Sequence, residues 1–461
     1  MSSSSRKLTA GTVLGAAVTA ALWGSQAMAA VPYGPYDLTL TASGSSAFRD
    51  QFRSELANGV CGGIANVYDF KASGTGAPDM RAYVCHTPAT GTPVPNKDII
   101  VYYRSELGSI TGYAPIQNNK QIKKLLVNAT QCGASPTIGG TTNACSVTGW
   151  NVNNDSCTAG CVADNVQLGV TDLEPAVLTG AGAPAAENGN YPIDAGLVAV
   201  LGPDPKGSTS NIGSVAGIAD QVFTFIVNSS PGVTNLNKQA LVSIFNGTYT
   251  DWSSVPKADG SGFVSGSPLP IILCERDQGS GTRASHTIYL GLSKQCNPSA
   301  LGINAAFSSF CNATSNECAS TGTEVSCVAS QAGAIGYAVN QGTTPPAGTK
   351  YIAIDGKLPN DGVTTTAPNA VAAAGGYDYW YQATMVYSKP LQTDATGLKA
   401  IADTIKNRLN NSANLPTSSA SLMADPASGV STPAIPVADV TKPVNVATRP
   451  GGSCSSPVNQ N

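Results

Sequence analysis

The sequence predicts an α/β fold in which mostly parallel sheets are flanked by helices. Apolar strands alternate with amphipathic helices along the chain, which is the order that βαβ units produce. Short turns rich in serine and glycine follow several of these strands. Because ligands of such sheets bind at the carboxyl ends of the strands, these turns are the expected position of a functional site. The 461 residues are enough for two or three domains.

The first half of the chain contains three such strand-and-turn units. Residues 36–56 read as an alternating strand, a Ser/Gly turn and a helix with apolar residues on one face. Residues 98–116 contain an apolar strand followed by a turn with Ser109. Residues 166–178 contain a further strand, and Asp172 stands at its end. We therefore expect Ser109 and Asp172 near one edge of a sheet.

The second half repeats the alternation. Residues 221–230 form a continuous apolar run, as expected for a strand that is buried on both faces. Residues 235–252 have a helical apolar stripe that Gly247 closes as a C-cap. Residues 332–340 are a late apolar strand.

The run "CERDQGSGTRASHTIYLG" (274–291) places a Gly-Ser-Gly-Thr turn before apolar residues at helical spacing, so a helix should begin near Ser280. The first N–H groups of a helix lack intrahelical partners and carry partial positive charge. With Arg276 and Arg283 on either side, the turn suits an oxyanion. An ordinary N-capped helix start explains the motif about equally well when it is considered alone.

The N-terminus, residues 1–29, reads as an export signal. Arg6 and Lys7 precede an apolar run and the small-residue site Ala27-Met28-Ala29, which predicts cleavage before Ala30. The apolar run is too short to span a bilayer comfortably, so we expect a periplasmic or secreted protein without a membrane anchor.

The cysteines predict disulfides rather than a metal site. An even count in an exported chain indicates pairing, and there are only two histidines, far apart in sequence. The one C-x3-C pair has no second pair at zinc-finger spacing. No connectivity follows from the sequence for the twelve cysteines, which are residues 61, 85, 132, 145, 157, 161, 274, 296, 311, 318, 327 and 454.

Charge argues against nucleic-acid binding. The chain has a net charge of −3, and only 11% of its residues are charged. No basic patch is visible, so nucleic acid is not an expected partner. A weakly acidic protein that binds an anion must do so through local geometry, with N–H groups and one or two arginines.

Several segments together resemble the phosphate-binding proteins of bacterial phosphate ABC transporters. They occur in the family's order and cover, in patches, residues 38–387. The most specific segment runs from Asn235 to Trp252, and Arg276 and the Gly-Ser-Gly-Thr turn follow it. The segments are "LTASGSSAF", "YYRSELGSITG", "LGVTDLEP", "FTFIVNSSPGVTNLNKQALVSIFNGTYTDW", "RDQGSGTR" and "GAIGYAVN".

The resemblance implies a two-lobed periplasmic-binding-protein fold of type II, in which two strands cross between the lobes. Lobe 1 would comprise residues 30–220 and 340–411, and lobe 2 residues 221–339. Two cysteine-bearing inserts, 113–164 and 296–327, have no counterpart in the family. The Ser/Ala/Pro-rich residues 412–461 read as a tail.

The resemblance also implies which residues bind phosphate, loop by loop. Ser46 and Ala47 match the first loop, Ser109 the second, Asp172 the third, and Arg276, Ser280, Gly281 and Thr282 the fourth. Arg283 matches no ligand position, and we expect a structural or rim role for it.

Physical reasons support these roles independently. Arginine offers planar paired donors that suit a tetrahedral oxyanion, and the hydroxyl groups add further donors. Asp172 makes sense beside an anion that carries a proton, because its carboxylate accepts a hydrogen bond from P–OH, whereas fully ionised sulfate has no proton to give. The alternative for Asp172 is a helix N-cap.

The sequence thus predicts an exported protein that captures inorganic phosphate in an interlobe cleft. We expect a monomer without cofactor, metal or enzymatic activity, with an inner-membrane ABC permease as a partner. Two alternatives stay open: an exported phosphate-ester hydrolase, for which no histidine or second carboxylate lies near the loops in sequence, and a secreted structural or interaction protein whose inserts form the working surface.

Overall fold

The protein is described here by a computed structural model. The signal peptide expected at 1–29, most of the second insert before residue 317, and most of the tail expected at 412–461 lie outside the described residues. These are residues 31–178, 198, 200–205, 208–293, 317–340, 344–360, 370–373, 375–411, 414–415, 422–423, 447–448 and 458–459.

One large mixed sheet organises the part from residue 31 onward. Its strands run in the order β10-β15-β9-β16-β8-β1-β4-β3-β2-β6, with β11 joined through β14 and β17 joined to β9. The strands of this sheet are β1 (Leu38–Gly44), β2 (Tyr68–Ser73), β3 (Met80–His86), β4 (Asp98–Arg104), β6 (Thr142–Ser146), β8 (Leu168–Thr171), β9 (Ile212–Asn228), β10 (Asn235–Leu236), β11 (Ile272–Leu273), β14 (Ala334–Val339), β15 (Thr349–Ile354), β16 (Trp380–Ser388) and β17 (Leu422–Met423).

Short two-stranded pairs and helices complete the described elements. The pairs are β5 (Gln121–Leu125) with β7 (Cys161–Asn165), β12 (Glu275–Arg276) with β13 (Glu317–Cys318), and β18 (Ala447–Thr448) with β19 (Val458–Asn459). The α-helices are α1 (Arg49–Gly59), α2 (Ala114–Gln117), α3 (Ala129–Cys132), α5 (Lys238–Phe245), α6 (Gly281–Tyr289), α7 (Thr321–Ser330), α8 (Ala370–Ala373), α9 (Lys389–Gln392) and α10 (Leu398–Leu409). The 3₁₀ helices are η1 (Ile64–Asn66), η2 (Gly108–Gly112), η3 (Pro175–Leu178) and η5 (Trp252–Ser254).

The predicted α/β class is confirmed, but the sheet is mixed rather than mostly parallel. β1 pairs in parallel with β4 and β8, whereas β3 pairs antiparallel with both β2 and β4. The connections on either side of β3 contain no described helix, and parallel neighbours need a crossover of a dozen or more residues, usually a helix. Short connections therefore account for the antiparallel pairs of β3, and β9 is also antiparallel to β14, β15 and β16.

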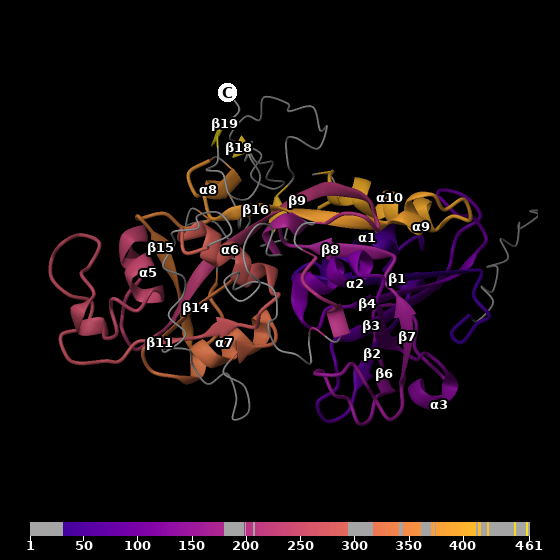
Figure 1. Ribbon diagram of the computed structural model, residues 1–461, viewed down its shortest axis with the longest axis horizontal. Coiled ribbons are helices and arrows are strands. Elements are labelled where there is room, and N and C mark those ends of the chain that lie inside the picture. The colour runs from indigo at the N-terminus through magenta and orange to yellow at the C-terminus, as the bar shows by residue number, and fades with distance from the viewer. Residues whose placement is uncertain are drawn as a thin grey trace, which may run out of the picture. The chain divides into compact units, whose positions relative to one another are not determined.

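β9 joins the two halves of this sheet. Its first part pairs with β16, from Ile212↔Ser388 to Val222↔Trp380. Its last part, from Phe223, lies between β14 and β15. Figure 1 shows β9 and β16 extending from the strands near β1 and β8 toward β14 and β15. Residues 223–227 of β9 are buried, as the continuous apolar sequence predicts.

The pairing of β15 bears on the expected lobe boundaries. The sequence prediction places residues 340–411 in lobe 1, whereas β15 pairs with the last part of β9 and with β10, on the side of the sheet that holds β14. β16 and α10, in contrast, join β8 and α1. Along the chain, β15 therefore still pairs beside β14, and β16 leads back to β8, while the lobe boundaries stay a prediction.

Two apolar cores pack against this sheet. Around β1, the helices α1 and α10 cover one face, with Phe52, Leu56, Ile401 and Ile405 fully or almost fully buried against the sheet. A second core surrounds the last part of β9, where Phe225 packs against Phe245 of α5 and against Tyr289 of α6. These cores fix the strands whose ends carry the site.

The first insert is ordered and is held to the sheet. β6 extends the sheet by pairing in parallel with β2, and β5 pairs with β7. Disulfides Cys132–Cys145 and Cys157–Cys161 lie within it. Two more disulfides, Cys61–Cys85 and Cys274–Cys327, join separate elements, and Cys318 is also disulfide-bonded. None of the described cysteines is free, so disulfide pairing is confirmed for them.

We expect a thiol titration of the purified, unreduced protein under denaturing conditions to find few or no free thiols. The reason is that the nine described cysteines are all oxidised, and exported proteins keep such pairs. Reduction with dithiothreitol before denaturation supplies the positive control. A count near twelve in the unreduced protein, or stoichiometric zinc, would contradict the disulfide assignment.

No described helix is both long and apolar enough to cross a membrane. Within the described residues, no group of three or more His, Cys, Asp or Glu side chains is arranged to hold a metal ion.

Candidate functional site

The site lies where β1, β4 and β8 end side by side. In the parallel register, Ser43 of β1 lies beside Arg104 of β4, and Gly44 beside Val170 of β8. All three strands end at the same edge of the sheet, because parallel strands run in the same direction. The turn before α1, the helix η2 and Asp172 therefore meet at this edge, as the sequence predicts for α/β sheets.

Asp172 is the centre of this edge. It is only 3% exposed, and its carboxylate accepts hydrogen bonds from the hydroxyl of Ser45 and, at 3.5 Å, from Thr282 Oγ1. Its backbone N–H donates to Ser109 Oγ at 3.1 Å. Both hydroxyl donors come from segments distant in sequence. The Asp172 side chain and backbone thus join the turn before α1, the helix η2 and the start of α6.

Gly281, the first residue of α6, lies directly against this carboxylate. A Cβ atom at this position would be 2.4 Å from Ser109 Oγ and 2.6 Å from Asp172 Oδ2, closer than real Cβ contacts. Only glycine permits so close an approach of the helix start. The Ser280 side chain caps α6 by accepting from the Arg283 N–H at 3.3 Å. The helix start therefore faces Asp172 and Ser109.

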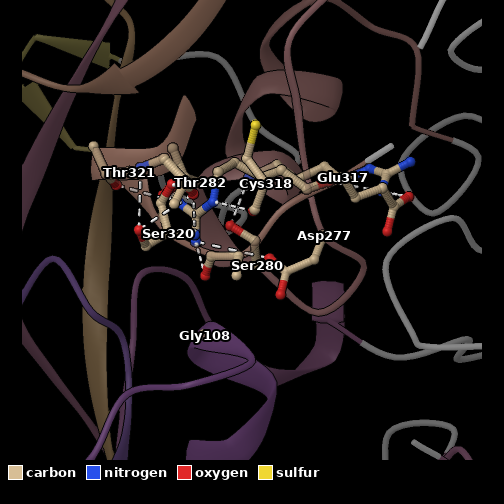
Figure 2. A network of polar contacts seen from close by, with 12 residues as sticks. Gly108, Asp277, Ser280, Thr282, Glu317, Cys318, Ser320 and Thr321 are labelled. Carbon is tan, nitrogen blue, oxygen red and sulfur yellow. Dashed lines mark hydrogen bonds and ion pairs between the residues drawn. The ribbon is translucent and has the colours of Figure 1, made fainter. Parts of the chain in front are cut away.

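A backbone contact joins the two turns further. The Ile110 N–H donates to Gly279 O at 3.0 Å. Gly108 has a φ of +69°, and a Cβ there would be 3.1 Å from Ser280 Cα. Figure 2 shows Gly108 on the helical turn below Ser280 and Thr282. The turn after β4 and the turn before α6 thus pack backbone to backbone.

Arg276 is buried behind Thr282, with 1% of its surface exposed. Its Nη1 lies 3.4 Å from Thr282 Oγ1 and 3.2 Å from Thr321 Oγ1, and its Nε donates to Cys318 O at 3.0 Å. Figure 2 shows Thr282, Thr321 and Cys318 grouped in this network. Arg276 therefore reaches Asp172 through the Thr282 hydroxyl.

The predicted ligand residues lie at this site to different degrees. Ser109, Asp172, Gly281 and Thr282 are in contact, and Ser280 and Arg276 support them from behind. The other two, Ser46 and Ala47, are half-buried in the turn before α1. The ligand set as a whole stays a prediction.

Ser45 is a site residue that the sequence reasoning missed. Its hydroxyl contacts Asp172 and also accepts from the Ala47 N–H at 3.1 Å. Ser45 and Ser46 are adjacent and chemically identical, so the sequence carries no signal that separates them. The register of the turn decides which hydroxyl points inward.

Burial controls the electrostatics of the site. Desolvation raises the pKa of Asp172, while the hydrogen bond from Ser45 and the charge of Arg276 act in the opposite direction. Behind Arg276, burial also raises the pKa of Glu275 to about 7, with the Arg283 charge opposing the shift. Glu275 accepts a hydrogen bond from the Tyr337 hydroxyl at 2.8 Å, and Tyr337 accepts from the Arg276 N–H.

We expect Glu275→Gln to flatten part of the pH dependence of stability. The pKa of the Glu275 carboxyl is near 4.5 in the unfolded chain and about 7 in the folded protein. Its contribution to the free energy of unfolding is therefore fully present below pH 4.5 and is lost as the pH rises through about 7. The wild type should therefore lose on the order of 3 kcal/mol more than the variant between these pH values. Urea unfolding at pH 4.5, 6 and 7.5 measures this difference, and parallel curves would contradict the shift.

The neighbouring Arg283 and His286 have structural environments. Arg283 forms an ion pair with Glu317 at 2.6 Å and donates to Arg276 O at 2.9 Å, which agrees with the structural role expected for it. His286 is fully buried, stacks on Tyr337 with ring centroids 4.0 Å apart, and burial holds its pKa well below the usual value. No hydrogen bond joins His286 to Ser280 in the part of the chain that the structure describes.

Comparisons with known proteins gave one family match and several solved structures. Solved structures that resemble the chain include a phosphate-binding protein from Stenotrophomonas maltophilia (15% identity, 81% of this chain and 84% of that chain covered, TM-score 0.39). Another is PstS from Borrelia burgdorferi (12% identity, 80% and 92% covered, TM-score 0.31). No curated protein matches the chain. Residues 218–404, from β9 into α10, match the family described as the PBP superfamily domain.

Proposed function

We propose that this protein captures a protonated oxyanion, inorganic phosphate, at the edge formed by β1, β4, β8 and the start of α6. The observation that carries the proposal is the buried carboxylate of Asp172, which is surrounded by the hydroxyls of Ser45, Ser109 and Thr282 and by the helix start at Gly281. Donors around a buried acceptor suit a ligand that both accepts and donates hydrogen bonds.

Each group has a role in this proposal. An entering phosphate would exchange the present hydrogen bonds among the hydroxyls for bonds to its own oxygens, so that no polar group is left unpaired. The first N–H groups of α6 would add donors with partial positive charge. Arg276, held against Thr282, would supply the balancing charge, and Ser46, Ala47 and Ser280 would complete the shell as the sequence predicts.

The setting proposed for this activity is outside the cytoplasm. Paired cysteines are typical of exported proteins, and residues 1–29 have the pattern of a cleaved export signal. We propose a monomeric, non-enzymatic solute-binding protein of the periplasm or extracellular space that passes phosphate to an inner-membrane ABC permease.

Calorimetric titration of the purified protein with phosphate and with sulfate tests the proposal. We expect one phosphate per chain, with sulfate at least about 100-fold weaker, because sulfate offers no proton to the buried carboxylate. Equal binding of both anions would make the site a general oxyanion site, and absence of phosphate binding would overturn the proposal. Incubation with p-nitrophenyl phosphate covers the hydrolase alternative, for which release of p-nitrophenol would be the positive result.

A further inference from the structure

The first insert packs onto the end of β4, immediately before the Ser109 turn. Asp155 lies in the insert turn that the bridge between Asn151 and Ser156 closes. Its carboxylate accepts from Arg104 Nη1 at 2.5 Å and from the Lys123 N–H at 2.7 Å. Arg104 is the last residue of β4 and is 2% exposed. A buried guanidinium requires such a partner, so this contact fixes where β4 ends.

Trp150 of the same insert holds the next part of the turn. Its Nε1 donates to Glu106 Oε1 at 3.1 Å, and its ring lies over the Arg104 guanidinium, 5.1 Å from the ring centroid. Glu106 stands three residues before Ser109. Through Asp155 and Trp150, the insert therefore contacts both Arg104 and Glu106. Hydrogen bonds and ring stacking depend on orientation, so these contacts restrict the positions of both side chains.

Hydrogen bonds continue from Arg104 to the helix η2. Ser43 Oγ lies 2.9 Å from Arg104 O and 2.8 Å from Thr111 Oγ1, and Thr111 Oγ1 donates to Gly108 O at 2.8 Å. The Ser109 hydroxyl, in the same short helix, accepts from the Asp172 N–H. A shift of Arg104 or Glu106 would therefore move the Ser109 hydroxyl relative to Asp172.

We propose that the cysteine-rich insert is the support that positions Ser109 for anion binding, with Trp150 and Asp155 as its positioning residues. The inference rests on the proposed phosphate site and goes beyond it, because the insert itself contributes no anion ligand. The insert is in turn closed next to these residues by Cys157–Cys161 and by the pairing of β5 with β7.

The test compares substitutions that break the support from either side. Trp150→Phe keeps an aromatic ring over Arg104 but removes the N–H donor, and Glu106→Leu removes its acceptor. Trp150→Phe should weaken phosphate binding about fivefold or more, which corresponds to one lost hydrogen bond. Glu106→Leu should weaken it at least as much, because it also removes the carboxylate 3.7 Å from Arg104 Nη2. Glu106→Gln keeps an acceptor and should bind nearly as the wild type does. Val162→Thr, at a 39% exposed position on β7, is the matched insert control and should change nothing.

A second readout does not depend on phosphate. In the anion-free protein, amide hydrogen exchange over residues 105–112 should be faster in Trp150→Phe and Glu106→Leu than in the wild type. Glu106→Gln and Val162→Thr should exchange at the wild-type rate. Thermal unfolding checks that each variant is folded. If Trp150→Phe does not fold, the result for Glu106→Leu tests the positioning role. A wild type that binds no phosphate would overturn the proposed function alone. Unchanged exchange and unchanged affinity in the folded variants would overturn the positioning role.

Discussion

Asp172→Asn is expected to raise the affinity for sulfate relative to phosphate by on the order of 100-fold, or nearly 3 kcal/mol. The buried carboxylate of Asp172 can only accept hydrogen bonds while it is ionised, so a fully ionised anion faces repulsion and an unpaired acceptor. The amide of asparagine can donate as well as accept, which removes both penalties. Phosphate should lose only part of its affinity, since the hydroxyls and the helix start remain.

The measurement is a titration of both anions into both proteins at one ionic strength. Asp251→Asn is a suitable control, because Asp251 caps η5 through its carboxylate, with Ser253 N–H at 2.8 Å, and lies outside the site. It should change thermal stability little, because asparagine caps a helix about as well as aspartate does, and it should leave the anion ratio unchanged. If Asp172→Asn behaved in the same way, Asp172 would be a helix cap and not a selectivity residue.

Arg276→Ala is expected to weaken phosphate binding by more than about 2 kcal/mol, or roughly 30-fold. The guanidinium lies against the Thr282 hydroxyl, which in turn contacts Asp172, and almost none of it is exposed to solvent. Its removal would take the balancing positive charge from a site that already holds a buried carboxylate. Isothermal titration at neutral pH measures the loss.

Because Arg276 also bonds to Cys318 O and Thr321, the alanine variant will be less stable as well. Arg276→Lys keeps the charge and should retain more affinity than Arg276→Ala. Arg283→Gln removes the neighbouring guanidinium, which contacts Glu317 and a backbone carbonyl, and should lower stability while phosphate affinity changes little. Equal loss of affinity in the Arg276 and Arg283 variants would show that general destabilisation, rather than the site charge, is responsible.

The sequence predicted the local features that govern the site. Apolar runs predicted β1, β4, β8 and the buried part of β9, and the family resemblance placed Ser109 and Asp172 at one site. The Gly-Ser-Gly-Thr turn marked the start of α6 within one residue. The export context predicted the oxidised cysteines. Strands, turns and helix starts can be predicted because hydrophobic periodicity and turn chemistry depend on residues that are close in sequence. Cysteine oxidation can be predicted because it depends on the compartment.

Contacts between distant segments were decided by the tertiary structure alone. Ser45, rather than the chemically identical Ser46, contacts Asp172 because the register of one turn sets which hydroxyl points inward. β15 joins the half of the sheet that holds β14, since strand pairing depends on long-range packing rather than on the local pattern. Trp150 of the insert contacts Glu106, 44 positions earlier in the sequence, although no periodicity relates the insert to the site. Local sequence determines where helices and strands form. The hydrogen-bond partners of a buried group depend instead on which elements the tertiary structure brings within about 3 Å of that group.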